Sequence, residues 1–273
     1  MYLYRKTKAI MNNLIIKNKL GRDLTNNINA WKQGFIDVDQ AKHWSEGYSA
    51  QSLGQFFTSG SGKVWLDNLS KLLFNSSIEY ESAEIEHRSK LDSYRGMQRM
   101  QDLALWGKIG SKSVFIAIEA KVLESFGNYS VRDEYELALL YRDKNPNSKK
   151  PNRVEDVVKF FFPELTPYDE PVCNLRYQLF HYFKASVLEG KTSDESKKSL
   201  TKRTHPDIVI LPVMVFKTKH YFENTPIAEQ NKKDYLAFCK ALGFAEKSLG
   251  NRTVFYKDFC HREIYTLYEE ISI

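Results

Sequence analysis

Two residues of opposite charge, Glu119 and Lys121, stand at the end of an apolar run where charge is costly. The run Ser113–Val122 alternates so that both faces of a strand would be apolar until its last residues, which is typical of a central, buried strand. Charged side chains in such a place lose hydration worth several kcal/mol unless they pair, bind a metal or do chemistry. Asp102 lies just upstream, in Gln-Asp-Leu-Ala-Leu-Trp. A carboxylate, a gap and then Glu-x-Lys is an arrangement used for metal-assisted phosphodiester hydrolysis.

That chemistry assigns a role to each residue. A divalent cation can activate water, neutralise charge on the phosphorane and help the leaving oxygen. Magnesium prefers oxygen ligands and keeps several waters, so the carboxylates of Asp102 and Glu119 with the carbonyl of Ala120 would suffice. Lys121 would orient the attacking water or balance charge on the phosphate. The alternative for an isolated Glu-x-Lys triplet is an ion pair on an amphipathic strand, and the flanking apolar run favours the catalytic interpretation.

The elements that must position these residues follow from the apolar pattern. Residues 77–88, 101–106 and 113–122 read as a three-stranded antiparallel meander, whose last two strands carry the candidate residues. The second strongly apolar run, 205–216, predicts another central strand. Residues 253–259 and 263–271 are expected to add strands at the sheet edge. Residues 1–40 indicate at most one short strand.

Helices are expected between these strands. Ser49 is predicted to be the N-cap of a helix that buries Leu53 and Phe57, and Thr225-Pro226 begins a late helix. The remaining predicted helices cover residues 63–74, 131–142, 153–162 and 174–189. The predicted fold class is therefore α/β, with a mixed central sheet flanked by helices.

Composition sets outer bounds. The chain has 273 residues, of which 42% are hydrophobic, enough for a sizeable core. A net charge of +6 permits a polyanionic partner without requiring one. Three widely spaced cysteines and no apolar stretch of 18 residues argue against a disulfide framework and a membrane span, so a cytoplasmic location without membrane association is expected. No phosphate-binding GxxxxGK[ST] or GxGxxG loop and no GxSxG elbow is present.

In these residues and their spacing, the chain resembles the PD-(D/E)xK nuclease superfamily, which has the restriction-endonuclease-like fold. Asp102 is followed after sixteen residues by Glu119-Ala120-Lys121. The wider pattern is similar to a largely uncharacterised bacterial group within that superfamily. Its pieces, in order, are His43-Trp44-x-x-Gly47-x-Ser49-Ala50, Glu86-His87, Gln101-Asp102-Leu103, Glu119-Ala-Lys-Val-x-Glu124-x-Phe126-Gly127 and Leu175-Arg-Tyr-Gln-Leu-x-His181.

The resemblance implies a restriction-endonuclease-like core, a Mg²⁺ or Mn²⁺ requirement and a nucleic-acid substrate. The nuclease-like domain would cover residues 41–245, with an N-terminal extension at 1–40 and a C-terminal extension at 246–273 packing on the same domain. Many such nucleases carry a further acidic ligand before the first strand, and its identity here stays open. The candidates are Asp67, Glu79, Glu81, Glu84 and Glu86.

Further residues could contact substrate. Gln178 and Tyr182 share one helix face and match the Gln-x-x-x-Tyr element of some nucleases of this superfamily, in which Gln can hold a phosphate or a metal-bound water. A polar face that packs on the sheet is the alternative. Other candidate phosphate contacts are Arg88, Arg95, Arg99 and Arg176. The basic clusters Lys149-Lys150-Arg153 and Lys197–Arg203 could hold a DNA backbone or could simply be solvated.

The sequence thus favours a metal-dependent nuclease that hydrolyses DNA, with a role in restriction, defence or repair implied by the resemblance alone. Endonuclease and exonuclease action, and DNA and RNA substrates, both stay open. The first alternative is a catalytically inactive nuclease-fold component of a larger system that binds nucleic acid or protein. A hydrolase of small phosphate esters is the other. A homodimer or a partner subunit would suit cleavage of both strands, although no dimer face is evident.

Overall fold

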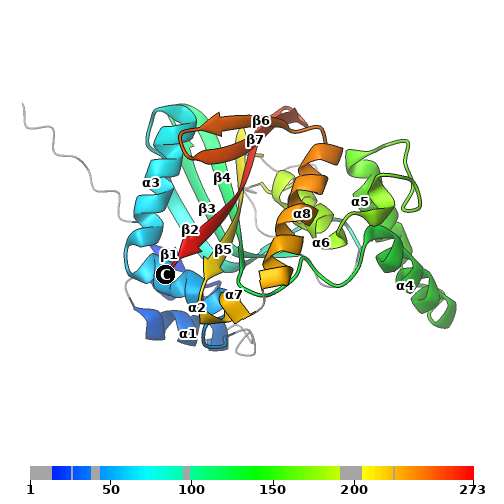
Figure 1. The fold of residues 1–273 in the computed structure, drawn as a ribbon, viewed down its shortest axis with the longest axis horizontal. Helices are drawn as coiled ribbons and strands as arrows, with labels where there is room; N and C mark the ends of the chain where they lie inside the picture. The colour runs from blue at the N-terminus through cyan, green and yellow to red at the C-terminus, as the bar shows by residue number, and fades with distance from the viewer. Residues whose placement is uncertain (1–13, 26, 38–43, 95–98, 191–204, 224) are drawn as a thin grey trace, which may run out of the picture.

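A single mixed β-sheet organises the molecule (Figure 1). The computed structural model describes residues 14–25, 27–37, 44–94, 99–190, 205–223 and 225–273. The sheet has eight strands in the order β1-β2-β3-β4-β5-β8-β7-β6. Helices pack on both sides of it, so the α/β class with a mixed, helix-flanked sheet is confirmed.

The predicted meander is present as β2 (Glu79–Ser89), β3 (Arg99–Ile109) and β4 (Lys112–Lys121). Both pairings are antiparallel, and Leu103 of β3 lies opposite Ile118 of β4. Residues 114–122 of β4 and its end are all buried, which confirms that the strand is apolar on both faces and central. Glu119 and Lys121 are therefore in the interior of the protein.

The later strands complete the sheet. β5 (Ile208–Lys217) pairs in parallel with β4, as its apolar sequence predicted for a central strand. β6 (Ala245–Leu249) and β7 (Arg252–Phe259) form the edge. β8 (Arg262–Ser272), expected at the edge, is instead an interior strand that pairs in parallel with β5. Its buried Ile264, Thr266 and Leu267 fit that position.

Helices α2 (Ser49–Thr58) and α3 (Ser61–Phe74) lie on one side of the sheet in Figure 1. On the other side stand α6 (Tyr177–Val187) and α8 (Thr225–Ala241), with α4 (Val131–Lys144) and α5 (Lys150–Phe161) outside them. The short helices η2 (Val172–Asn174) and α7 (Lys219–Glu223) connect these elements. Residues 175 and 176 belong to the helix predicted over 174–189, but their backbone is extended. Helix α6 begins at Tyr177.

The N-terminal region holds more structure than expected. β1 (Ile16–Lys17) is the one short strand predicted there, but α1 (Ile28–Asp37) follows it. Trp31 and Phe35 of α1 are almost completely buried, and the Asn27 side chain accepts hydrogen bonds from the backbone N–H of Asn29 and Ala30 at the helix start. Strands from the expected N-terminal and C-terminal extensions thus join the same sheet as the middle of the chain.

Across the described residues, no helix combines the length and the apolar character that a membrane crossing would need.

Candidate functional site

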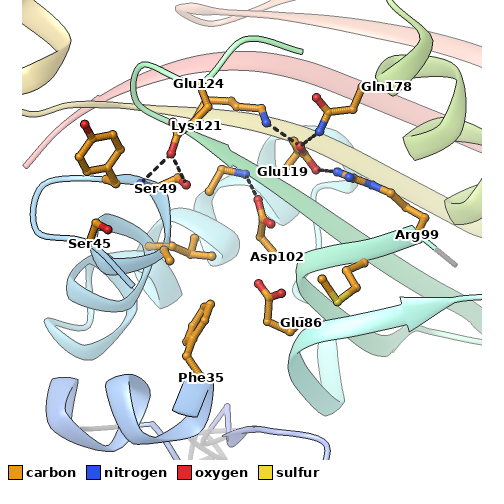
Figure 2. A pocket seen from close by; sticks show the side chains of 15 residues that line it. Phe35, Ser45, Ser49, Glu86, Arg99, Asp102, Glu119, Lys121, Glu124 and Gln178 are labelled. Carbon is orange, nitrogen blue, oxygen red and sulfur yellow. Dashed lines mark hydrogen bonds and ion pairs between the residues drawn. The ribbon is translucent and has the colours of Figure 1, made fainter. Parts of the chain in front are cut away.

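A cavity of about 350 Å³ opens beside the end of β4 (Figure 2). Strands β2, β3 and β4 form one wall, and the beginning of α2 and the side chain of Gln178 on α6 form the others. Its polar lining residues are Ser45, Tyr48, Ser49, Glu86, Arg99, Asp102, Glu119, Lys121, Glu124 and Gln178. The structure therefore brings together every residue for which the sequence predicted a direct role in catalysis or metal binding, including Ala120.

Glu119 has three side-chain partners in the cavity and is only 2% exposed. Its Oε1 lies 2.9 Å from Nζ of Lys121 and accepts a hydrogen bond of 3.0 Å from Nε2 of Gln178. Its Oε2 pairs with the guanidinium of Arg99. Burial would raise the pKa of Glu119, but the positive charges of Arg99 and Lys121 outweigh it and lower that pKa. Glu119 is thus an anion held between two cations.

Asp102 lies on β3 beside the Glu119 carboxylate. Its Oδ2 accepts a hydrogen bond of 2.6 Å from the backbone N–H of Ala120, which fixes the carboxyl group against the end of β4. Burial raises the pKa of Asp102 to about 7, and the negative charge of Glu119 adds to the rise. The two carboxylates thus share one cavity and repel each other.

Glu86 of β2 is the third carboxylate of the cavity. Its backbone is in the left-handed region, with φ of 51°, which is unusual for a residue other than glycine in a strand and turns its side chain toward Asp102 (Figure 2). Burial, followed by the charge of Asp102, raises the pKa of Glu86 to about 8. Among the acids considered for the further ligand, Glu86 alone lines the cavity.

The other four acids lie elsewhere. Asp67 pairs with Lys63 on α3, and Glu81 pairs with Lys108. Glu84 contacts His87, and Glu79 is exposed at the start of β2.

The chemistry of this donor set fits a divalent cation. Asp102, Glu119 and Glu86 line the same cavity, and the pKa values of Asp102 and Glu86 are raised because the burial of like charges is unfavourable; a cation would relieve that repulsion. Within the described part of the chain, no three His, Cys, Asp or Glu side chains are already arranged around one point as a metal centre. To ligate a cation through Oε2, Glu119 would have to release the guanidinium of Arg99. To ligate one through Oδ2, Asp102 would have to release the backbone N–H of Ala120.

The predicted phosphate contacts separate into two groups. Arg99 lines the cavity, and Arg88 is exposed on β2 close enough for its charge to act on Glu86. Arg176 instead pairs with Asp234 at 2.8 Å. Tyr182 is completely buried, and its hydroxyl donates hydrogen bonds to the carbonyl oxygens of Ala117 and Pro212, because these strand carbonyls face α6.

Arg176 and Tyr182 therefore hold α6 in place rather than facing the cavity. Arg95, His43 and the cluster at residues 197–203 lie outside the described residues.

The beginning of α2 is a part of the site that the sequence assigned differently. The N-cap residue is Tyr48, which makes no capping bond through its side chain, and not Ser49. The carboxylate of Glu124 performs that task from the loop after β4, accepting hydrogen bonds from Oγ of Ser49 at 2.7 Å and from the backbone N–H of Ser49 and Val122. Glu124 thus ties α2 to the turn beside Lys121.

Phe35 also lines the cavity, although the sequence analysis did not single it out. It is buried on α1 and packs against Trp44 at a ring separation of 5.5 Å. The spacing of Ile28, Trp31 and Phe35 is that of one helix face and would have indicated the helix.

Comparison with protein-family models finds one family along most of the chain. The family described as "Domain of unknown function (DUF6946)" matches residues 24–266. Comparisons with curated proteins and with solved structures each found no match. The matched range includes all residues of the cavity.

Proposed function

This chain belongs to the DUF6946 family, and we propose that it is a divalent-metal-dependent nuclease, built on a restriction-endonuclease-like core, that hydrolyses DNA phosphodiester bonds. One observation carries the proposal. Asp102, Glu119 and Glu86 converge in a single cavity that also holds a buried lysine and an amide donor, Gln178. Three carboxylates with a lysine at the end of a central strand match the needs of metal-assisted phosphodiester hydrolysis.

Asp102, Glu119 and Glu86 would hold the cation, Mg²⁺ or Mn²⁺, together with the carbonyl of Ala120. The bound cation would supply water activation and charge neutralisation. Glu86 completes the acidic set that two carboxylates alone left short of a ligand. Because the pKa of Glu86 is raised, a proton competes with the cation for its carboxylate.

The remaining polar residues have roles on the substrate side. Lys121 is 6% exposed and touches Glu119, so its ammonium group can orient the attacking water or balance charge on the phosphate. Gln178 donates to Glu119 and stands at the cavity wall, where its amide can position that carboxylate or a phosphate oxygen. Arg99 places a second positive charge on the other oxygen of Glu119, and this charge would also attract a phosphate in the cavity.

A second candidate function has an observation of its own in its favour. Arg99 already neutralises Glu119, and the Ala120 N–H already bonds Asp102, so these two carboxylates have protein partners without a cation. Such pairing is expected of a non-catalytic component that has kept the fold and binds nucleic acid or protein. A role in restriction, defence or repair is compatible with either function.

Incubation of the purified protein with plasmid, linear and single-stranded DNA, single-stranded RNA and a small phosphodiester tests the proposal, in EDTA, Mg²⁺ or Mn²⁺. Asp102→Ala and Lys121→Ala are the test variants, and Asp67→Ala and Lys108→Ala, which remove matched charges from surface ion pairs, are the controls. We expect metal-dependent DNA cleavage that both test variants lose and both controls keep. Nucleic-acid binding without cleavage under either metal would support the second candidate, and hydrolysis of the small diester alone would overturn both.

A further inference from the structure

A second cavity, of about 500 Å³, lies where α4 ends and α5 begins, apart from the first. Its volume falls within the range of roughly 300 to 1,000 Å³ usual for small-molecule sites. Lys149, Lys150 and Arg153 line it, together with the rings of Tyr94 and Tyr141. In Figure 1 this corner of the molecule stands beyond α6, on the side of the sheet opposite α3. None of these residues has a part in the function proposed above.

The cavity carries positive charge that the protein leaves available. Lys149 and Lys150 are exposed, and no carboxylate among the described residues forms an ion pair with either. Arg153 is bonded to Asp92 in a two-pronged contact, Nε to Oδ2 at 2.6 Å and Nη2 to Oδ1 at 3.1 Å, and therefore fixes the wall without adding net charge. The two lysines would thus be the groups that attract an anion.

The cavity also offers aromatic surface. Tyr141 is 44% exposed, and Nζ of Lys150 sits 3.7 Å from the centre of its ring. The hydroxyl of Tyr94 donates to Asp156 at 2.6 Å, which holds that ring in place. Asn145 and Asn147 complete the lining with amide donors and acceptors. The exposed ring of Tyr141 beside lysines and amides matches a nucleotide, which has a base to stack, edges to hydrogen-bond and a phosphate to pair.

One residue of α6 feels charges from both cavities. His181 is half-buried, and its pKa is lowered to about 3 by burial and then by the charges of Arg99, Arg153 and Lys184. Arg99 belongs to the first cavity and Arg153 to the second. Asp92, which holds Arg153, and Tyr94 lie on the segment that follows β2, the strand that carries Glu86.

We infer that the cavity between α4 and α5 is a second nucleic-acid contact, in which a nucleotide of the bound strand, away from the cleaved bond, stacks on the face of Tyr141 that Lys150 leaves uncovered and places its phosphate on Lys149 and Lys150. This inference rests on the proposed function for the identity of the ligand, a nucleic-acid strand. It assigns a role to the Lys149-Lys150-Arg153 cluster, which the sequence left between a DNA contact and a solvated loop. A strand held at both cavities would be bound more tightly than one that reaches only the first.

Binding without cleavage tests it. The affinity of the full-length protein for labelled single-stranded DNA of 16 and of 4 nucleotides is measured by fluorescence anisotropy in EDTA, over a series of salt concentrations. The variants are Lys149→Ala/Lys150→Ala, Tyr141→Ala and Tyr141→Phe. The matched control is Lys232→Ala/Lys233→Ala, which removes two exposed lysines from α8. Thermal unfolding of each variant confirms that it is folded.

We expect the Lys149→Ala/Lys150→Ala protein to bind the long strand about tenfold more weakly, with its salt slope reduced by about 0.7, the value for one phosphate contact on a single strand. Tyr141→Ala should weaken binding by about fivefold or more, and Tyr141→Phe should restore it, because stacking needs the ring and not the hydroxyl. The short strand and the α8 control should bind as before. dAMP should compete with the long strand better than inorganic phosphate does.

Three results would overturn the inference: equal losses in the α5 and α8 lysine variants, a loss in Tyr141→Phe equal to that in Tyr141→Ala, or equal competition by phosphate and dAMP, which would indicate a simple anion site. Tighter binding of an acidic peptide than of DNA at this cavity would also overturn it. The outcome is separable from that of the proposed function. If the protein cleaves DNA and the variants bind it as the wild type does, only the inference of a second contact is rejected. If the variants bind DNA more weakly but the protein cleaves nothing, only the proposed nuclease function is rejected.

Discussion

Glu86 and Asp102 face each other across β2 and β3, between the register pairs Ile85–Leu103 and His87–Gln101. Each is an acid on a strand next to the cavity, and the charge of Asp102 contributes to the raised pKa of Glu86. The left-handed backbone of Glu86 keeps its side chain on the cavity side. Two facing acids are destabilising unless a proton or a cation stands between them, so this pair is the part of the site most dependent on a ligand.

The first prediction concerns Glu86 as a ligand. Glu86→Gln should weaken Mn²⁺ binding by at least about tenfold, a loss typical for groups that support a metal site. In EDTA the variant should be at least as stable as the wild type, because the substitution removes repulsion from Asp102 and Glu119, and the Glu86 side chain has no hydrogen bond to another described residue. Titration calorimetry measures the affinity, with Glu79→Gln at the exposed start of β2 as the control. Equal Mn²⁺ affinity in the two variants would mean that Glu86 is no ligand.

The second prediction is a pH dependence of metal binding. Asp102 and Glu86, with pKa values of about 7 and about 8, hold protons that a cation must displace. Mn²⁺ affinity should therefore rise as pH increases from 6 to 8.5 and should level off above that range. Calorimetry in buffers of different ionisation enthalpy should show protons released on binding at pH 7. An affinity that does not change over this range would contradict the raised pKa values.

The third prediction concerns stability without metal. In the unfolded chain Asp102 loses its proton near its ordinary pKa of 3.8, whereas in the folded protein it keeps the proton up to about 7. Between these values the folded state binds more protons, so the free energy of unfolding should fall as pH rises, by at most about 1.4 kcal/mol per pH unit for this group. Below pH 4 the contribution is fully present.

Asp102→Asn should flatten that part of the curve. Urea unfolding in EDTA between pH 4 and 8 measures it, with Asp67→Asn as the control that should keep the wild-type slope.

Much of the fold could be predicted because the relevant signals are local. The apolar run of β4 and its terminal Glu119 and Lys121 are visible in ten consecutive residues, and the meander follows from the turns between its strands. The position of β8 next to β5 could not be predicted, because the two strands are far apart in sequence and many pairings would bury the same residues. Local pattern does not decide among such pairings.

The convergence of the candidate site residues on one cavity could be predicted for the same reason. Asp102 and Glu119 lie on neighbouring strands of a meander, so their convergence follows from local structure. Glu86 could not be singled out from four other acids, because its entry into the cavity depends on one left-handed backbone conformation. The capping of α2 by Glu124, 75 residues from Ser49, is likewise a property of the tertiary structure alone.

The last prediction concerns Arg99, to which the two candidate functions assign different roles. Arg99→Ala leaves Glu119, a buried carboxylate, with one fewer cation, and removal of one partner from a buried ion pair costs about 3 to 5 kcal/mol. The variant should therefore unfold at a lower temperature in EDTA, whereas Arg88→Ala, exposed on β2, should not. If Glu119 is a metal ligand, Mn²⁺ should raise the unfolding temperature of Arg99→Ala more than that of the wild type, because the cation no longer competes with the guanidinium. If Mn²⁺ leaves both proteins unchanged, the Arg99 pair is a permanent structural contact and the non-catalytic function gains support.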